Sequence, residues 1–191
     1  ALDKAMAIKN EWELANIAKA CEIAENAFNE LLPQIKEGMT ETEVAALLEY
    51  NMRSLGAQGL SFDTIVAFGK NASVPHHVPG NTKLKKGMAI LMDFGCSYQG
   101  YCSDMTRTVY FGKPDKTFRK AYAVALKAHL DARNAITAGM PTKDADAIAR
   151  TVIEESEFKG LFTHSLGHGV GVHIHELPNL SPLATAVFAE N

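Results

Sequence analysis

The sequence predicts an α+β fold in which a pair of helices followed by a β-hairpin is repeated, and three observations support this. Its 191 residues are 47% hydrophobic and 21% charged, as in a globular protein with a buried core. Segments with apolar residues at helical spacing are interleaved with segments rich in β-branched and aromatic residues. The dipeptide Gly38-Met39 lies between two predicted helices, and Gly139-Met140 lies in the same setting later in the chain.

The first half of the chain predicts two helices and a strand. Apolar side chains, with Trp12 and Phe28 expected in the core, recur at helical spacing in the first helix. Thr40 and Glu43 have the spacing of a capping box at the start of the second helix. The expected elements are a helix over residues 10–35, a helix over 40–56, a strand over 60–68 and a loop over 70–83.

The second half predicts a hairpin and another pair of helices. The expected elements are strands over 88–96 and 101–111, a long helix from Pro114 to just before Gly139, and a short helix over 142–156. If the repeat holds, the counterpart of Asp93 falls just past Asn191. The sequence therefore predicts one domain over residues 1–191 whose C-terminal part, a second hairpin, is missing.

Two aspartates of the predicted hairpin are candidate metal ligands. A turn centred between Tyr98 and Gln99 would place Asp93 directly opposite Asp104, with Cβ atoms about 5 Å apart. Two carboxylates at that separation repel each other, and a divalent cation between them would relieve the repulsion. The alternative is that Arg107 or a lysine pairs with one aspartate while the other faces solvent.

Four histidines, at positions 164, 168, 173 and 175, lie close together near the C-terminus. His164 and His168 have the spacing of a helical zinc pair, but Gly167, Gly169 and Gly171 oppose a helix. Glycines in such number instead let the backbone approach a ligand closely. Imidazoles together with carboxylates favour Mn, Fe, Co or Zn over Mg or Ca.

Five ordered motifs resemble the pita-bread metallopeptidases, and most closely the Xaa-Pro dipeptidases (prolidases) and aminopeptidase P. The motifs are Phe62-Asp63-Thr64-Ile65-Val66, Pro75-His76-His77, Met92-Asp93-Phe94-Gly95, the segment from Gly100 to Thr108, and Gly167-His168-Gly169-Val170-Gly171 followed by His175-Glu176-Leu177-Pro178. The resemblance implies the pita-bread fold with its pseudo-twofold repeat, incomplete here at the C-terminus.

The resemblance also implies a role for each matching residue. It implies that Asp93, Asp104 and His168 bind two divalent metal ions, with Mn the expected ion and Co, Zn or Fe as alternatives. His76, His175 and His164 match catalytic histidines that contact the substrate or the developing oxyanion. The family completes its site with two glutamates that would follow Asn191, so three of five expected ligands are present and the fragment by itself should be weakly active or inactive.

The implied activity is hydrolysis, by a hydroxide shared between the metals, of Xaa-Pro dipeptides or of peptides with proline at the second position. The alternatives are a methionine aminopeptidase, a creatinase-like hydrolase, and a non-catalytic peptide- or protein-binding module of the same fold. The resemblance implies a homodimer for the full-length protein. A net charge of -3 and a pI near 6.2 argue against nucleic-acid and membrane partners, and three cysteines favour the cytoplasm.

Overall fold

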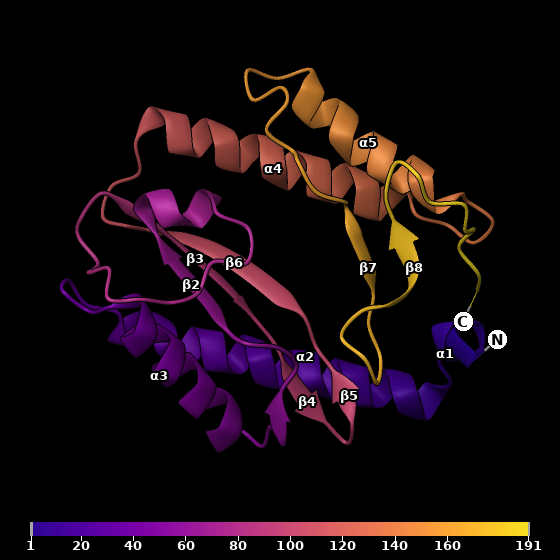
Figure 1. The fold of residues 1–191 in the computed structure, drawn as a ribbon, viewed down its shortest axis with the longest axis horizontal. Coiled ribbons are helices and arrows are strands. Elements are labelled where there is room, and N and C mark those ends of the chain that lie inside the picture. Colours follow the sequence, from indigo (N-terminus) through magenta and orange to yellow (C-terminus); the bar gives the residue numbers. More distant parts are fainter. Residues whose placement is uncertain (1, 191) are drawn as a thin grey trace. The chain divides into compact units, whose positions relative to one another are not determined.

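The computed structural model describes residues 2–190, and the chain divides into two compact units. The sheet unit comprises Glu11–Pro114 and Val170–Ile174. The helix-pair unit comprises Ala1–Asn10, Asp115–Gly169 and His175–Asn191. Both units mix helices with strands, so the predicted α+β class is confirmed (Figure 1).

The sheet unit contains two helices and two antiparallel three-stranded sheets. Its elements are α2 (Glu11–Leu31), η1 (Leu32–Gln34), α3 (Glu41–Ser54), β1 (Gly59–Leu60), β2 (Ile65–Phe68), η2 (Gly69–Ser73), β3 (Met88–Phe94), β4 (Cys96–Tyr98), β5 (Tyr101–Cys102) and β6 (Met105–Phe111). The strand orders are β2-β3-β6 and β1-β4-β5. The predicted capping box is confirmed, because the Glu43 amide donates to the Thr40 hydroxyl and the Thr40 amide donates to the Glu43 carboxylate.

Helices α2 and α3 pack on the sheet β2-β3-β6 and form the main core (Figure 1). Phe28 of α2 stacks on Phe94 of β3 with ring centroids 6.0 Å apart. Trp12 does not join this core, contrary to the prediction from its helical spacing. It is 61% exposed and packs edge-on against Tyr101, because the first turn of α2 lies beside β5.

The hairpin is confirmed, but its register differs from the prediction by two residues. Tyr98 pairs with Tyr101, so the turn is Gln99-Gly100, and both turn residues have positive φ, +50° and +82°. A two-residue turn with positive φ at both positions matches the twist of the flanking strands. Asp93 therefore pairs with Thr106, and Asp104 is not directly opposite Asp93.

The two hairpin strands and the strand beside them are each interrupted at neighbouring positions. The predicted strand over 60–68 breaks into β1 and β2, which pair with β4 and β3 respectively. The hairpin breaks at Gly95 and at residues 103–104. A Cβ atom at position 95 would overlap the Ser103 carbonyl oxygen, so glycine permits the close approach of the two hairpin strands there.

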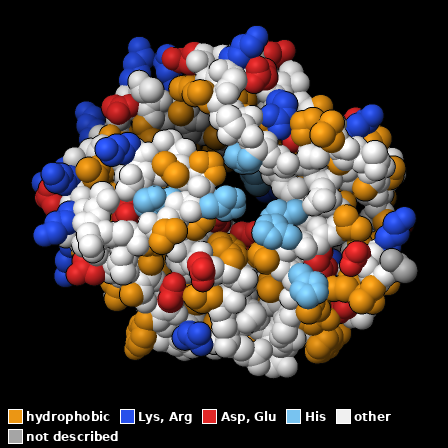
Figure 2. Space-filling model, in the orientation of Figure 1, with side chains coloured by type: hydrophobic (Ala, Val, Ile, Leu, Met, Phe, Trp, Pro, Cys, Tyr) orange, Lys and Arg blue, Asp and Glu red, His pale blue; other side chains and the backbone are white. Residues whose placement is uncertain are grey.

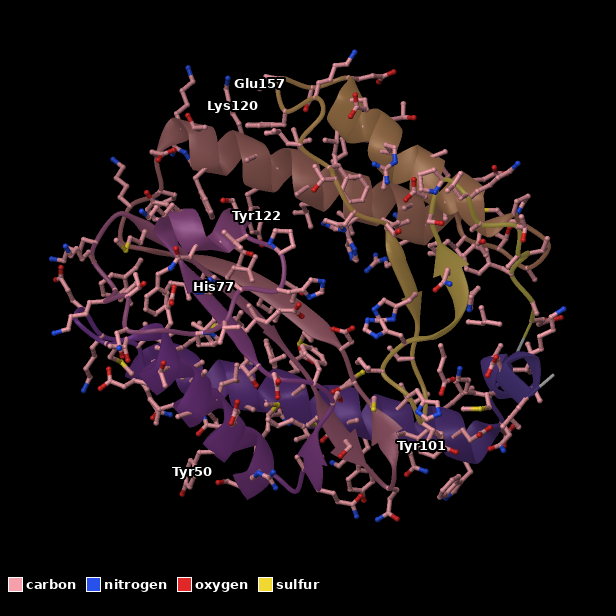
Figure 3. The ribbon with its side chains drawn as sticks, in the orientation of Figure 1. Tyr50, His77, Tyr101, Lys120, Tyr122 and Glu157 are labelled. Carbon is pink, nitrogen blue, oxygen red and sulfur yellow. The ribbon has the colours of Figure 1, made fainter. Side chains whose placement is uncertain are left out.

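The helix-pair unit is built on two adjacent helices and a short hairpin. Its elements are α1 (Leu2–Ala7), α4 (Lys116–Ala135), α5 (Thr142–Glu154), β7 (Gly167–Gly169) and β8 (Glu176–Leu180). An ion pair of 2.6 Å joins Lys120 of α4 to Glu157, which follows α5 (Figure 3). The glycine-rich segment forms strand β7 and not a helix, as its glycines predicted.

The predicted repeat is visible in backbone hydrogen bonds within each unit. Gly38 donates to the Leu84 carbonyl, and Leu84 donates to the Met39 carbonyl, at 2.9 and 2.8 Å. In the helix-pair unit, the Gly139 amide donates to the Phe188 carbonyl at 2.8 Å, and the Phe188 amide donates to the Met140 carbonyl at 2.9 Å. Both glycines have φ near +90°, a conformation that glycine adopts without a Cβ penalty. The same connection between two helices is therefore built twice.

Acidic and basic side chains are interspersed on the molecular face drawn in Figure 2. Within residues 2–190, none of the helices has both the length and the apolar character needed to cross a bilayer.

Candidate metallopeptidase site

Asp93 is half-buried near the end of β3, and its carboxylate is oriented by the neighbouring strand. The Thr106 hydroxyl donates a hydrogen bond of 2.9 Å to Asp93 Oδ1. In the observed register Asp104 would face Gly95, two residues from Asp93. A shift by two residues preserves the alternation of strand faces, so the expected direct contact between the aspartates becomes a diagonal relation.

Asp104 is exposed and lies between β5 and β6, where the hairpin is interrupted. Burial raises the pKa of the Cys21 thiol, and the negative charge of Asp104 raises it further. Burial likewise raises the pKa of the Cys96 thiol. Raised values keep thiols protonated, which disfavours both of these cysteines as nucleophiles.

His168 and His175 lie together in the helix-pair unit. His168 is on β7 and His175 immediately precedes β8, and their ring centroids are 4.3 Å apart. His168 Nδ1 lies 2.9 Å from the Gly169 carbonyl oxygen. Because a carbonyl oxygen only accepts, Nδ1 carries the hydrogen, and in the neutral ring the lone pair that would bind a metal is on Nε2.

His164 is held by a buried ion pair on α5. Asp146, whose side chain is 1% exposed, accepts two bonds from Arg150 and one from the Leu166 amide. Arg150 in turn donates to the carbonyl oxygens of Phe162 and His164. Its guanidinium lies 4.3 Å from the Phe162 ring centroid, and the Asp146 hydrogen bond raises the pKa of Arg150. These contacts fix both ends of the segment that carries His164.

His175 is held through the residue that follows it. Glu176 is buried and forms a 2.8 Å ion pair with Lys9, whose side chain is 8% exposed. The buried pair joins the segment that follows α1 to the first residue of β8. Such a pair restrains the backbone beside His175, because breaking it would leave a charge buried without its partner.

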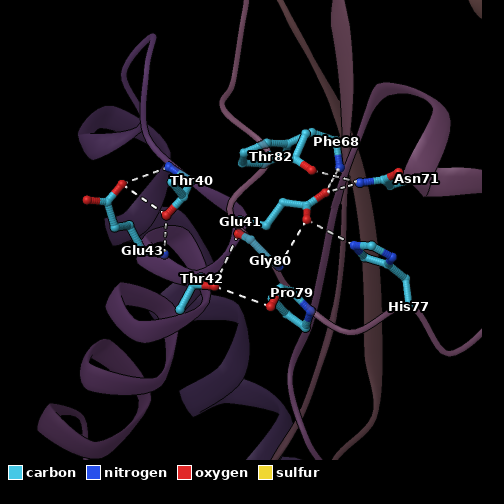
Figure 4. Close-up of polar contacts among 10 residues, drawn as sticks. All are labelled: Thr40, Glu41, Thr42, Glu43, Phe68, Asn71, His77, Pro79, Gly80 and Thr82. Carbon is cyan, nitrogen blue, oxygen red and sulfur yellow. Dashed lines mark hydrogen bonds and ion pairs between the residues drawn. The ribbon is translucent and has the colours of Figure 1, made fainter.

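His76 lies in the loop that follows β2 in the sheet unit, and its side chain is exposed. Its φ of +55° is uncommon for a residue with a side chain and costs on the order of 1–3 kcal/mol. The loop is tied to α3 by Glu41, whose carboxylate accepts from His77, Asn71 and two backbone amides. Glu41 is therefore the buried anchor of the loop that presents His76 (Figure 4).

Each predicted site residue is thus placed within its own unit. Asp93, Asp104 and His76 belong to the sheet unit, and His164, His168 and His175 to the helix-pair unit. Within the parts of each unit described by the structure, no three His, Cys, Asp or Glu side chains form a metal-binding group. The three-ligand set therefore stays a prediction.

Comparison with known proteins identifies the family. Residues 15–191 match metallopeptidase family M24. The chain belongs to this family. The pita-bread architecture of the M24 chain follows from its structural neighbours, which include the X-Pro aminopeptidase from Thermotoga maritima, with a TM-score of 0.97 and 40% identity. That likeness covers 100% of this M24 chain and 54% of the aminopeptidase.

Two further relatives agree with this assignment. Prolidase from Pyrococcus furiosus has a TM-score of 0.96 and 40% identity, over 99% of this M24 chain and 56% of the prolidase. An uncharacterized peptidase from Staphylococcus saprophyticus is 44% identical over 181 residues, which are 95% of this chain and 52% of the relative. The M24 chain thus spans about half the length of the relatives that it matches.

Four supporting residues escaped the sequence analysis, namely Lys9, Glu41, Asp146 and Arg150. Asp146 and Arg150 have the spacing of a helical ion pair, which is a detectable signal. Their burial and their contacts with residues 162–166 depend on tertiary structure. Glu41 follows the capping residue Thr40, so its sequence context suggests only a favourable charge at a helix start.

Proposed function

We propose that the full-length M24 protein hydrolyses the peptide bond that precedes proline, using two divalent metal ions. The observation that carries the proposal is a likeness to an X-Pro aminopeptidase that covers 100% of this chain. Asp93, Asp104 and His168 are the proposed ligands because the motifs that contain them resemble the metal-binding motifs of the family. Two further carboxylates, from parts of the protein outside these residues, would complete the metal ligands.

The chemistry of the three side chains fits such ions. Carboxylates and an imidazole suit Mn, Co, Zn or Fe. Asp93 is oriented by Thr106, and the Nδ1 hydrogen bond of His168 fixes the tautomer in which Nε2 binds metal. When bound, the two ions supply a water of lowered pKa and polarise the scissile carbonyl.

Three histidines would act on the substrate. His175, packed against His168 at 4.3 Å, would donate a ring N–H to the carbonyl oxygen as negative charge develops there. His76 and His164 would bind and orient the peptide, and both are exposed side chains on segments tied down by buried carboxylates. Tying the segments before substrate arrives lowers the cost of orienting it.

The substrate assay uses full-length protein loaded with Mn²⁺. Ala-Pro and Leu-Pro dipeptides and a longer peptide with proline at the second position are compared with matched peptides that carry alanine there. Release of the N-terminal residue from the proline substrates alone is expected. Equal cleavage of the alanine peptides would reject proline specificity, and absence of any hydrolysis by the metal-loaded protein would reject the catalytic proposal in favour of a binding module.

The ligand assignment is tested by substitution in the same full-length protein. Asp93→Asn, Asp104→Asn and His168→Ala should each lower kcat/KM by at least about 100-fold, more than is typical for loss of a ligand's hydrogen-bond partner, and lower the bound metal measured by mass spectrometry. Asp131→Asn and His129→Ala on the exposed side of α4 are the matched controls. Wild-type metal content in a ligand variant would remove that residue from the set.

A further inference from the structure

Glu41 is a fully buried carboxylate whose hydrogen bonds all lead to one loop. Oε1 accepts from the Phe68 amide and from Asn71 Nδ2, both at 2.8 Å. Oε2 accepts from His77 Nε2 at 2.9 Å and from the Gly80 amide at 3.1 Å. The four donors span the end of β2, η2 and the loop up to Gly80, so one side chain secures the whole connection (Figure 4).

The surroundings of Glu41 favour its ionised form. Burial alone would raise the pKa of Glu41, but the hydrogen bonds from Asn71, His77 and the two amides outweigh burial and lower it. The residue is also the first of α3, where the partial positive charge of a helix N-terminus stabilises an anion. Because an ionised carboxylate only accepts, the Nε2 nitrogen of His77 must carry the hydrogen that it shares with Glu41.

His76 lies between points that this network holds. On its N-terminal side the Val74 amide donates to the Asn71 carbonyl at 3.0 Å, and Asn71 is itself bound to Glu41. On its C-terminal side, His77 binds Glu41 directly through a side chain that is only 17% exposed. His76 has a φ of +55° and an exposed side chain. An unfavourable backbone conformation persists where its surroundings impose it.

We propose that Glu41 and His77 are positioning residues that hold His76 in the orientation needed to contact substrate. The two consecutive histidines therefore have different roles. His77 is hydrogen-bonded to the buried Glu41, whereas the side chain of His76 is exposed. This inference deepens the proposed function and rests on it for the role of His76. Neither Glu41 nor His77 is expected to touch the peptide or the metals.

The first test is a set of substitutions in the Mn²⁺-loaded full-length protein, assayed with a Xaa-Pro dipeptide. His77→Ala and Glu41→Gln should lower kcat/KM by about 10–100-fold, the range expected when a catalytic group is displaced by about 1 Å. His77→Gln, which restores an N–H donor, should recover most of the loss. Glu43→Gln is the matched control two residues along α3, and its kcat/KM should stay within about twofold of wild type.

The second test separates positioning from a general structural role. His77→Ala is combined with His76→Ala, and the double variant should be no slower than His76→Ala alone, because residues that act as a unit are not additive. The proposal would be overturned if kcat/KM of the double variant were lower than that of His76→Ala by the same factor by which His77→Ala alone falls below wild type. It would also be overturned by a wild-type kcat/KM in His77→Ala. Bound metal should match wild type in every one of these variants.

A third readout does not depend on catalysis. Amide hydrogen exchange over residues 74–80 should become at least about tenfold faster in His77→Ala and Glu41→Gln, while exchange in β3 stays unchanged. An unprotected loop in wild type, or unchanged exchange in both variants, would overturn the inference. If wild type were inactive on every Xaa-Pro substrate, the proposed function would fail, and this exchange measurement would still decide whether the pair holds the loop.

Discussion

Replacing Asp146 by alanine should destabilise the chain by about 2–4 kcal/mol and release the segment that carries His164. The carboxylate of Asp146 is 1% exposed and accepts three hydrogen bonds, two from Arg150 at 2.8 and 3.0 Å and one from the Leu166 amide at 3.0 Å. Removing the carboxylate leaves both the Arg150 guanidinium and the Leu166 amide without this acceptor.

The magnitude follows from what each donor loses. The Leu166 amide loses its acceptor, which costs about 1–3 kcal/mol if water cannot replace it. Arg150 keeps its bonds to the Phe162 and His164 carbonyls, and its side chain is 26% exposed, so water can solvate part of the guanidinium. The loss therefore falls below the upper end of the 3–5 kcal/mol typical of breaking a fully buried pair.

The assay is urea unfolding of wild type and Asp146→Ala, with hydrogen exchange over residues 162–166 as a local readout. A loss of this size corresponds to a fall in Tm of about 4–16 °C for a chain of this length. Lys127 and Asp131 provide the matched control, because they form an ion pair of the same helical spacing on α4 with exposed side chains. Asp131→Ala should cost less than about 1 kcal/mol. Equal losses in the two aspartate variants would refute the reasoning from burial.

Three other outcomes follow from single contacts. The lowered pKa of Glu41 means that its ionised form stabilises the fold above the ordinary glutamate value of about 4.3, so the stability gap between wild type and Glu41→Gln should narrow as urea titrations move from pH 6 to pH 3. Gly169→Ala would overlap a backbone carbonyl and should lower Tm by several degrees, whereas Gly167→Ala, with open space around the new methyl, should not. Lys9→Met should lower the free energy of unfolding by about 2–4 kcal/mol, because it leaves Glu176 buried without its cation. The double variant Lys9→Met/Glu176→Gln should recover part of that loss, measured by chemical denaturation.

Local signals in the sequence were sufficient for most of the helices and strands. The Thr40–Glu43 capping box located the start of α3, and the repeated Gly-Met dipeptides located two equivalent connections. The hairpin register was the main error. Glycine readily adopts the positive φ required at the second position of a two-residue turn. Placing Gln99-Gly100 in the turn, with Tyr98 paired to Tyr101, would have given the correct register.

Contacts made by distant residues explain what the sequence did not predict. Trp12 lies on the apolar stripe of α2, but periodicity does not reveal that its turn packs beside a short strand and leaves the ring exposed. Glu41 belongs to an unremarkable helix start, and only the fold brings donors from residues 68–80 to its carboxylate. The candidate histidines were found by composition and motif, whereas the groups that hold them depend on tertiary structure.

The two units differ in how much apolar surface is available to stabilise them, and this difference bears on the size of the effects above. The sheet unit buries large side chains such as Phe94, Met92 and Leu48, whereas the buried apolar cluster between α4 and α5 consists of three alanines with partly buried neighbours. Burial of apolar area contributes about 25 cal/mol per Å², so small side chains contribute little. Buried polar contacts such as Asp146–Arg150 and Lys9–Glu176 must then determine more of the order in the helix-pair unit. Substitution of either pair should consequently loosen His164 or His175 sooner than loss of a comparable contact loosens β3.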